Sequence, residues 1–169
     1  MAKINIKSFF TDIILAVVIV VSISIFIKPT IVSGESMEPA LNDGDYLFLS
    51  RQAYHIGNVE RNQIVVFPVE EDNDKLYIKR VVGLPGDRVK IQEGQLYVNG
   101  TAVDQSFTKD GCTPGDMQEI TVPDGKIFVL GDNRANSTDS RVIGSQNIED
   151  VTGVVFVRLW PLNEIGRVQ

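Results

Sequence analysis

Two residues, Ser36 and Lys79, have the types and surroundings that nucleophilic catalysis would need. Ser36 lies in the segment SGESMEPALNDGD (33–45), between glycines that permit sharp turns and a close backbone approach. A serine hydroxyl is a weak nucleophile until a neighbouring base takes its proton. Lys79 could be that base, because burial disfavours the ammonium form and lowers the pKa of a lysine toward neutrality. Such a pair requires no metal, and no cofactor is expected.

Each residue also has an ordinary structural explanation. Ser36 could cap a short helix. In the segment LYIKRVVGLPGD (76–87), strand alternation places Lys79 on the same face as Tyr77 and Val81. A lysine beside apolar groups is commonly an edge residue whose charged end reaches water. Taken singly, the two residues leave these alternatives open.

A third segment, LGDNRANSTDSR (130–141), is a polar loop that directly follows a predicted strand. A calcium loop beginning at Asp132 fails on detail. That pattern requires glycine at its sixth position and glutamate at its twelfth, where this chain has Ser137 and Ile143. A hydrogen-bonding hub that supports other groups fits the segment better.

The chain has one histidine and one cysteine. A Ser-His-Asp triad would have to use His55, but its neighbours Tyr54 and Gly57 carry no catalytic pattern, so we expect a solvated loop histidine. Cys112 lies in the loop TKDGCTPGD (108–116), which predicts an exposed free thiol in a surface insertion. One cysteine excludes an intramolecular disulfide and a cysteine-based zinc cluster.

The elements that must position these residues are mostly short strands. Apolar runs separated by turn residues cover 45–50, 63–69, 75–83, 88–103, 118–123, 126–132 and 153–161. Within 88–103, a Glu-Gly pair and an Asn-Gly pair favour tight hairpin turns, which predicts a three-stranded meander. Only 36–42 and 146–151 leave room for a helical turn. The fold class is therefore mainly β, an antiparallel sheet or β-barrel-like domain with an insertion at about 88–125.

The N-terminal segment 9–27 (FFTDIILAVVIVVSISIFI) has the composition of a membrane helix, since 15 of its 19 residues are apolar and Asp12 is its only charge. About 20 residues at 1.5 Å rise cross roughly 30 Å of hydrocarbon. One alternative is a core helix of a soluble protein. A one-sided soluble helix would alternate with polar residues, whereas this run is apolar all round. A cleavable signal peptide is the other alternative, with small residues at Val32 and Gly34, but the apolar run continues without a polar break. The segment predicts an uncleaved transmembrane anchor.

The charge distribution bears on topology and on partners. The net charge is −6; three lysines against Asp12 give residues 1–28 a charge of +2, which leaves −8 for residues 29–169. An acidic remainder argues against nucleic-acid binding, which depends on lysine and arginine. Because more lysines precede the apolar segment than follow it, residues 1–8 are expected in the cytoplasm and residues 28–169 outside.

In their order, these segments resemble the bacterial type I signal peptidases (leader peptidases) of the compact Gram-positive type. The resemblance rests on the anchor followed by SGESMEPAL, GDYLFL, YIKRVVGLPGD and LGDNRANSTDSR, and covers nearly the whole chain. It implies the fold of that family, with a single anchor in the plasma membrane. It also implies a serine endopeptidase with a Ser-Lys dyad that removes N-terminal signal peptides from secreted preproteins after small residues.

The resemblance also implies residue roles. Ser36 matches the nucleophile and Lys79 the general base. Ser137 matches the hydroxyl that orients the lysine, and Asp139 with Arg141 matches a supporting ion pair. Asp139 must then bond Arg141, because a carboxylate touching Lys79 would raise the pKa of the lysine and stop the chemistry.

Further roles follow from the same resemblance. Gly131 and Asp132 match the tight turn that shapes the site. The backbone N–H of Ser36 matches one oxyanion donor, and Gly34 stands where many relatives have a serine that supplies the second. The candidate walls of shallow apolar substrate pockets are Ile31, Val32, Leu76, Ile78 and Val81.

Three alternatives stay open at the level of sequence. The first is a membrane-anchored, non-enzymatic β-domain. The second is a self-cleaving Ser-Lys peptidase of the repressor type, which the anchor disfavours. The third is a Ser-Lys peptidase dedicated to one client, such as a pilin or a spore protein. The expected partners are secretory preproteins and the lipid bilayer, with no nucleic acid, and the expected state is a monomer.

Overall fold

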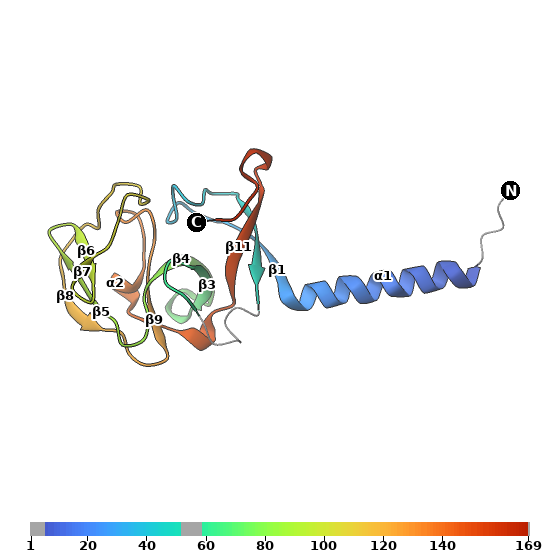
Figure 1. Ribbon diagram of the computed structural model, residues 1–169, viewed down its shortest axis with the longest axis horizontal. Helices are drawn as coiled ribbons and strands as arrows, with labels where there is room; N and C mark the ends of the chain where they lie inside the picture. The colour runs from blue at the N-terminus through green and yellow to red at the C-terminus, as the bar shows by residue number, and fades with distance from the viewer. Residues whose placement is uncertain (1–5, 52–58, 169) are drawn as a thin grey trace.

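The computed structural model describes residues 6–51 and 59–168. Helix α1 (Ile6–Phe26) projects away from the β domain (Figure 1). Its window Phe9–Phe26 has a mean hydropathy of 2.6, and none of it is buried against protein. Ser22 and Ser24 donate their hydroxyls to carbonyl oxygens one turn earlier, at 2.7 and 2.8 Å, which suits a helix without water. By length and composition, α1 is a candidate membrane span.

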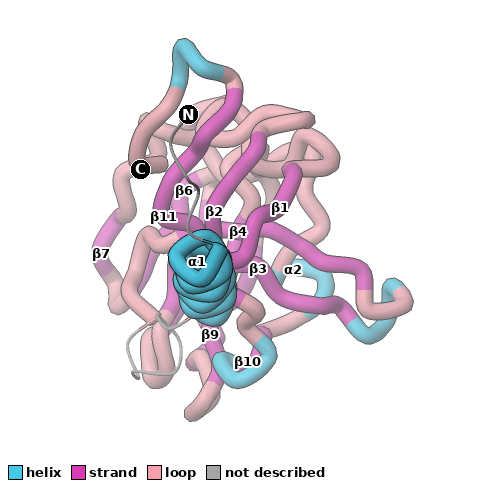
Figure 2. Tube along the Cα trace, turned by 90° about the vertical axis from the view of Figure 1, so that its right-hand side faces the viewer, coloured by secondary structure: helices cyan, strands magenta, loops and turns pink. Residues whose placement is uncertain are grey.

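The larger sheet has seven strands, all paired antiparallel. They are β1 (Ile27–Ile31), β2 (Tyr46–Ser50), β3 (Ile64–Val69), β4 (Lys75–Gly83), β9 (Lys126–Leu130), β10 (Gln146–Asn147) and β11 (Gly153–Trp160). Their order in the sheet is β1-β2-β11-β3-β4-β9-β10. Strand β1 continues directly from α1 and pairs with β2 along its whole length, as the view along the helix shows (Figure 2). Strand β4 lies between β3 and β9, so both of its edges are paired.

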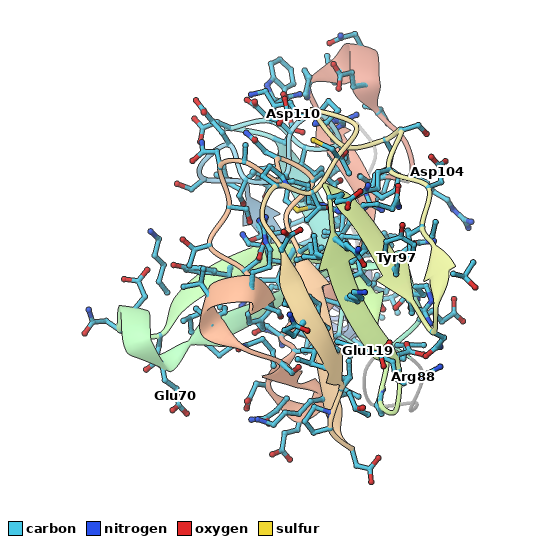
Figure 3. The ribbon with its side chains drawn as sticks, turned by 90° about the vertical axis from the view of Figure 1, so that its left-hand side faces the viewer. Glu70, Arg88, Tyr97, Asp104, Asp110 and Glu119 are labelled. Atoms are coloured by element: carbon cyan, nitrogen blue, oxygen red, sulfur yellow. The ribbon has the colours of Figure 1, made fainter. Side chains whose placement is uncertain are left out.

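A smaller antiparallel sheet is formed by β5 (Arg88–Gln92), β6 (Gln95–Val98), β7 (Thr101–Ala102) and β8 (Met117–Thr121), in the order β7-β6-β5-β8. Its inner face packs Ile91 and Leu96 against Phe128 of β9. Its outer face, seen in Figure 3, carries charged residues such as Arg88 and Glu119, which lie 3.6 Å apart. This alternation of apolar and polar residues is typical of a sheet with one solvated face.

The turn between β1 and β2 is held by the hydrophobic core. Met37 and Leu41, which follow Ser36, are 1 % and 0 % exposed. They pack in one cluster with Leu47 and Leu49 of β2. Deleting a buried side chain of this size costs about 2–5 kcal/mol of stability, so the backbone around Ser36 is firmly anchored.

The predicted fold class is confirmed, and each predicted apolar run contains a strand. The predicted three-stranded meander is β5, β6 and β7. Some details differ from the sequence-based expectation. Strand β1 was not expected as a strand, because its apolar residues continue the membrane segment. The expected helical turn at 36–42 is present as a single turn, in which the Leu41 N–H donates to the Met37 carbonyl oxygen at 2.9 Å. A short helix, α2 (Ser140–Ile143), lies in the polar loop, where none was expected. Over the described ranges, the strand pairing closes neither sheet into a barrel. Short 3-10 turns occupy Glu70–Asp72, Ile148–Asp150 and Leu162–Glu164.

Candidate active site

Ser36 and Lys79, which are 43 positions apart in the chain, meet in space. Lys79 Nζ lies 2.8 Å from Ser36 Oγ and donates to the carbonyl oxygen of Ile78 at 3.0 Å. The lysine is 3 % exposed. Its position on the central strand β4 brings it into the interior, while the turn after β1 brings the serine to it.

Burial is the main influence on the Lys79 ammonium. It lowers the pKa of Lys79 from 10.5 to about 8, against the negative charge of Asp139, which raises it; the charge of Lys75 lowers it further. The ring of Tyr77 lies beneath Lys79, 5.0 Å from Nζ. A substantial fraction of neutral amine therefore exists near pH 8, which a general base requires.

Gly131 lies against the back of this pair. A Cβ at position 131 would stand 2.5 Å from the carbonyl oxygen of Ser36 and closer still to Ser137 Oγ. Only glycine permits this approach. Ser137 Oγ is buried and has no hydrogen-bond partner within residues 6–51 and 59–168. The structure thus brings Ser137 beside the turn between β1 and β2 that carries the candidate nucleophile Ser36, called here the nucleophile turn. Ser137 makes no hydrogen bond to Lys79, and its orienting role stays a prediction.

Asp139 pairs with Arg141, as the resemblance implied. The two oxygens of Asp139 accept from Nε and Nη2 of Arg141, both at 2.8 Å. Asp139 is 0 % exposed, and its Oδ2 also accepts the N–H of Gly131 at 3.0 Å. The carboxylate therefore fixes the glycine turn and is balanced by an arginine of its own.

Asp132 has a partner that sequence reasoning missed. Its two oxygens accept from Nε and Nη2 of Arg80 at 2.8 and 2.7 Å, and both residues are buried. Arg80 follows Lys79 on β4 and so faces the other side of the strand. The adjacent Lys-Arg pair in a strand-like run was the available signal.

Asn133 is a second residue that sequence reasoning missed. Its N–H donates to the carbonyl oxygen of Ser36 at 3.0 Å, and its Nδ2 donates to that of Glu35 at 3.1 Å. The two loops that carry the candidate site are thus tied directly together. In the sequence, only the presence of an asparagine in the polar loop pointed to this contact, because Ser36 lies 97 positions before Asn133.

A groove of about 430 Å³ opens over the pair. Of the predicted pocket walls, Ile31, Val32, Leu76 and Ile78 line it. The prediction was wrong for Val81, which is 0 % exposed and packs in a core cluster. Strand alternation does place Val81 on the Lys79 side, but Val81 packs there in a core cluster with Ile143 of α2 and Val151.

The oxyanion assignment also needs a correction at Gly34. This glycine has no side-chain donor, and its N–H donates to Asp43 Oδ1 at 2.8 Å, so it is already used. The N–H of Ser36 donates to no group in the part of the chain that the structure describes. Ser36 N–H therefore remains the candidate oxyanion donor.

Two candidates from the sequence remain, His55 and Cys112. His55 lies outside the described residues. Cys112 is a free thiol but half-buried, where an exposed one was expected. Among residues 6–51 and 59–168 no group of three metal-ligating side chains comes together.

Comparison with known proteins identifies the family of this chain. Residues 6–160 match the family model described as signal peptidase, peptidase S26. A signal peptidase I of Bacillus caldolyticus is 40 % identical over 89 % of this chain and 90 % of that protein. One of Bacillus amyloliquefaciens is 39 % identical over 93 % and 89 %. A solved signal peptidase I from Enterococcus faecalis V583 is 34 % identical, covering 57 % of this chain and 96 % of that one, with a TM-score of 0.49. The chain belongs to the signal peptidase family, peptidase S26.

Proposed function

We propose that this protein is a membrane-anchored serine endopeptidase that removes N-terminal signal peptides from secreted preproteins, with Ser36 as nucleophile and Lys79 as general base. The observation that carries the proposal is the 2.8 Å separation of Lys79 Nζ and Ser36 Oγ at a groove with apolar walls. The family relationship supports the activity, and the lowered pKa of Lys79 supports its role.

The proposed reaction has two halves. Ser36 Oγ attacks the carbonyl carbon of the scissile peptide bond while its proton passes to neutral Lys79 Nζ. The carbon–nitrogen bond breaks, and the Lys79 ammonium gives that proton to the leaving amine. Water then attacks the carbonyl carbon of the Ser36 ester as Lys79 takes one of its protons. The bond from that carbon to Ser36 Oγ breaks, Lys79 gives the proton to Oγ, and the signal peptide leaves as a carboxylic acid that ionises in water. The Ser36 N–H stabilises the oxyanion in both halves.

Three further groups support the dyad in this proposal. The Ser137 hydroxyl, which is buried beside Gly131 and has no hydrogen-bond partner among the described residues, orients the Lys79 amine. Asp139 with Arg141, and Asp132 with Arg80, hold the loop on which Gly131 lies. Because each carboxylate has an arginine, neither one is available to form an ion pair with Lys79.

The proposed substrate and location follow from the path of the chain. Strand β1 continues from α1, and its last residues line the groove. Ser36 lies ten residues after Phe26, and an extended chain covers at most ~3.6 Å per residue, so the nucleophile stays within about 36 Å of the helix end. We propose that the apolar part of α1 from Phe9 onward spans the plasma membrane, with residues 1–8 in the cytoplasm. The enzyme then acts, as a monomer, on extended segments that emerge from the outer face.

Cleavage of a preprotein by the detergent-solubilised full chain tests the function. Ser36→Ala and Lys79→Ala should abolish cleavage, whereas Ser145→Ala, a serine outside the groove, should retain it. Ser137→Ala should lower kcat with little change in stability, because in the structure the hydroxyl has no hydrogen-bond partner within residues 6–51 and 59–168. Cleavage that survives both dyad substitutions would refute the mechanism. Absence of cleavage by the unsubstituted protein would favour a non-enzymatic β-domain.

A further inference from the structure

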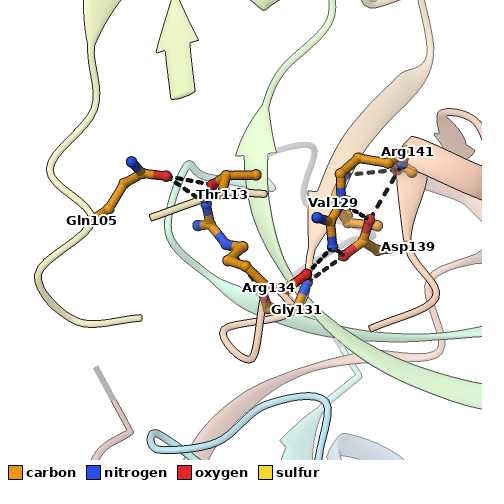
Figure 4. A network of polar contacts seen from close by, with 8 residues as sticks. Gln105, Thr113, Val129, Gly131, Arg134, Asp139 and Arg141 are labelled. Atoms are coloured by element: carbon orange, nitrogen blue, oxygen red, sulfur yellow. Dashed lines mark hydrogen bonds and ion pairs between the residues drawn. The ribbon is translucent and has the colours of Figure 1, made fainter. Parts of the chain in front are cut away.

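A buried polar network joins the loop between β7 and β8 to the polar loop 131–139, called here the site loop (Figure 4). Its centre is Arg134, which is 1 % exposed. Arg134 Nε donates to the carbonyl oxygen of Gly131 at 3.0 Å. Its Nη1 donates to Gln105 Oε1 at 3.1 Å and to the hydroxyl of Thr113. One guanidinium therefore bonds both the site loop and the loop 103–116, which connects β7 to β8 and is called here the connecting loop.

Burial of this arginine is costly. It lowers the pKa of Arg134 to about 10, against the charges of Asp132 and Asp139, which raise it. Nη2 of Arg134 finds no partner in the described part of the chain. A buried cation with an unsatisfied nitrogen destabilises a fold relative to an apolar side chain of similar volume. Packing alone gives no reason for an arginine here.

The connecting loop is itself held by the smaller sheet. Gly94, in the turn between β5 and β6, accepts the N–H of Thr113 at 2.8 Å and Nε2 of Gln105 at 3.1 Å. Thr113 also donates its hydroxyl to Gln105 Oε1. The two partners of Arg134 are thus tied to the sheet and to each other.

The connecting loop reaches the nucleophile turn by a second route. Lys109 N–H donates to the carbonyl oxygen of Asp132 at 3.1 Å. Lys109 Nζ lies 2.7 Å from Glu38 Oε2, two residues after Ser36. The links at Arg134 and Lys109 bracket the turn at Gly131 and Asp132.

We propose that Arg134, Gln105 and Thr113 are positioning residues, through which the smaller sheet sets the place of Gly131 and hence of Ser36 and Ser137. None of the three lines the groove, so none contacts substrate there. Gly131 has no room on the side of Ser36, so a shift of its carbonyl is passed to the nucleophile. A misplacement of about 1 Å can reduce a rate by roughly 100-fold. The inference rests on the proposed function.

A pair of substitutions at Thr113 separates positioning from packing. Thr113→Val keeps the shape and removes the hydroxyl; Thr113→Ser keeps the hydroxyl and removes the methyl group. With the full chain in detergent and a preprotein substrate, we expect Thr113→Val to lower kcat on the order of 10-fold with KM nearly unchanged, and Thr113→Ser to stay within about twofold. Thr121→Val, the same change at an exposed position of β8, is the control and should match the unsubstituted protein.

The single cysteine gives a second, independent readout. Cys112 is half-buried and precedes Thr113 in the connecting loop. Arg134→Met should speed the alkylation of Cys112 by iodoacetamide, because the loop loses its bond to the site loop. Arg134→Lys keeps the positive charge but has a single donor group, so its kcat should also be lower than that of the unsubstituted protein.

The outcomes distinguish the inference from the function. If the unsubstituted chain cleaves the preprotein but Thr113→Val is as active as Thr113→Ser, the positioning proposal fails and the peptidase stands. Loss of activity in Thr113→Ser but not in Thr113→Val would assign the residue to packing, with the same consequence. If the unsubstituted chain cleaves nothing, both proposals fail together. Unchanged Cys112 alkylation in Arg134→Met would refute the mechanical link whatever the activity.

Discussion

Replacing Lys79 by methionine should stabilise the protein at neutral pH while it abolishes activity. Lys79 is 3 % exposed, and burial lowers its pKa from 10.5 to about 8. Each pKa unit corresponds to about 1.4 kcal/mol. The shift of about 2.5 units therefore represents roughly 3 kcal/mol of instability below pH 8, where the folded protein must hold a buried ammonium. Methionine fills a similar volume without that charge.

The sign of the pH dependence is fixed by proton uptake. Between pH 8 and pH 10.5 the unfolded chain binds the lysine proton and the folded chain does not, so the stability of the unsubstituted protein rises with pH in this window. The charge-dependent part of the advantage of Lys79→Met should be complete at pH 7 and vanish near pH 10.5. The loss of two hydrogen bonds at Nζ offsets the gain by a pH-independent amount of about 1 kcal/mol each.

Urea unfolding of the full chain in detergent, followed by circular dichroism at pH 7, 9 and 10.5, measures this difference. The decisive quantity is how much the difference in unfolding free energy between Lys79→Met and the unsubstituted protein changes from pH 7 to pH 10.5. The hydrogen-bond contribution does not depend on pH, so it cancels in this change. Lys126→Met is the matched control for loss of a positive charge elsewhere in the larger sheet. A difference that stays constant with pH would refute the buried, low-pKa lysine.

Three other substitutions test the supporting groups. Arg141→Met should move the acid limb of the kcat profile to higher pH, because the freed carboxylate raises the pKa of Lys79; cleavage rates measured from pH 6 to pH 10 check this. Gly131→Ala should lower kcat by at least about 10-fold, since its Cβ overlaps the nucleophile turn, as steady-state kinetics would show. Asp132→Asn should cost about 3 kcal/mol or more in urea unfolding, because Arg80 keeps a buried charge without its carboxylate.

The elements could be predicted from sequence because each depends on local pattern. The apolar run of α1, the alternation along the strands and the paired turns at Gly94 and Gly100 need no tertiary information. Strand β1 was missed since a strand that continues a membrane helix has no local boundary. That Ile27–Ile31 forms a strand is evident only from its pairing with β2.

The candidate site was predictable only in part. Ser36 and Lys79 were found because their motifs resemble a family in order and spacing. Val81 was wrongly placed because alternation gives the face of a strand and not what covers it. Arg80 and Arg134 were missed because an arginine reads as a surface residue until its buried partners are known, and Thr113 lies 21 positions from Arg134.

The charges around Lys79 suit its proposed role as a base next to two buried carboxylates. A carboxylate that bonded Lys79 would hold it protonated, and Asp139 does raise the pKa of Lys79. Asp139 instead accepts hydrogen bonds from Arg141 and from the N–H of Gly131, while Asp132 accepts from Arg80. Three buried or half-buried arginines, including Arg134, thus oppose two carboxylates. Desolvation of the lysine then dominates, and the same bonds that balance the charge also fix the glycine against which the nucleophile turn packs.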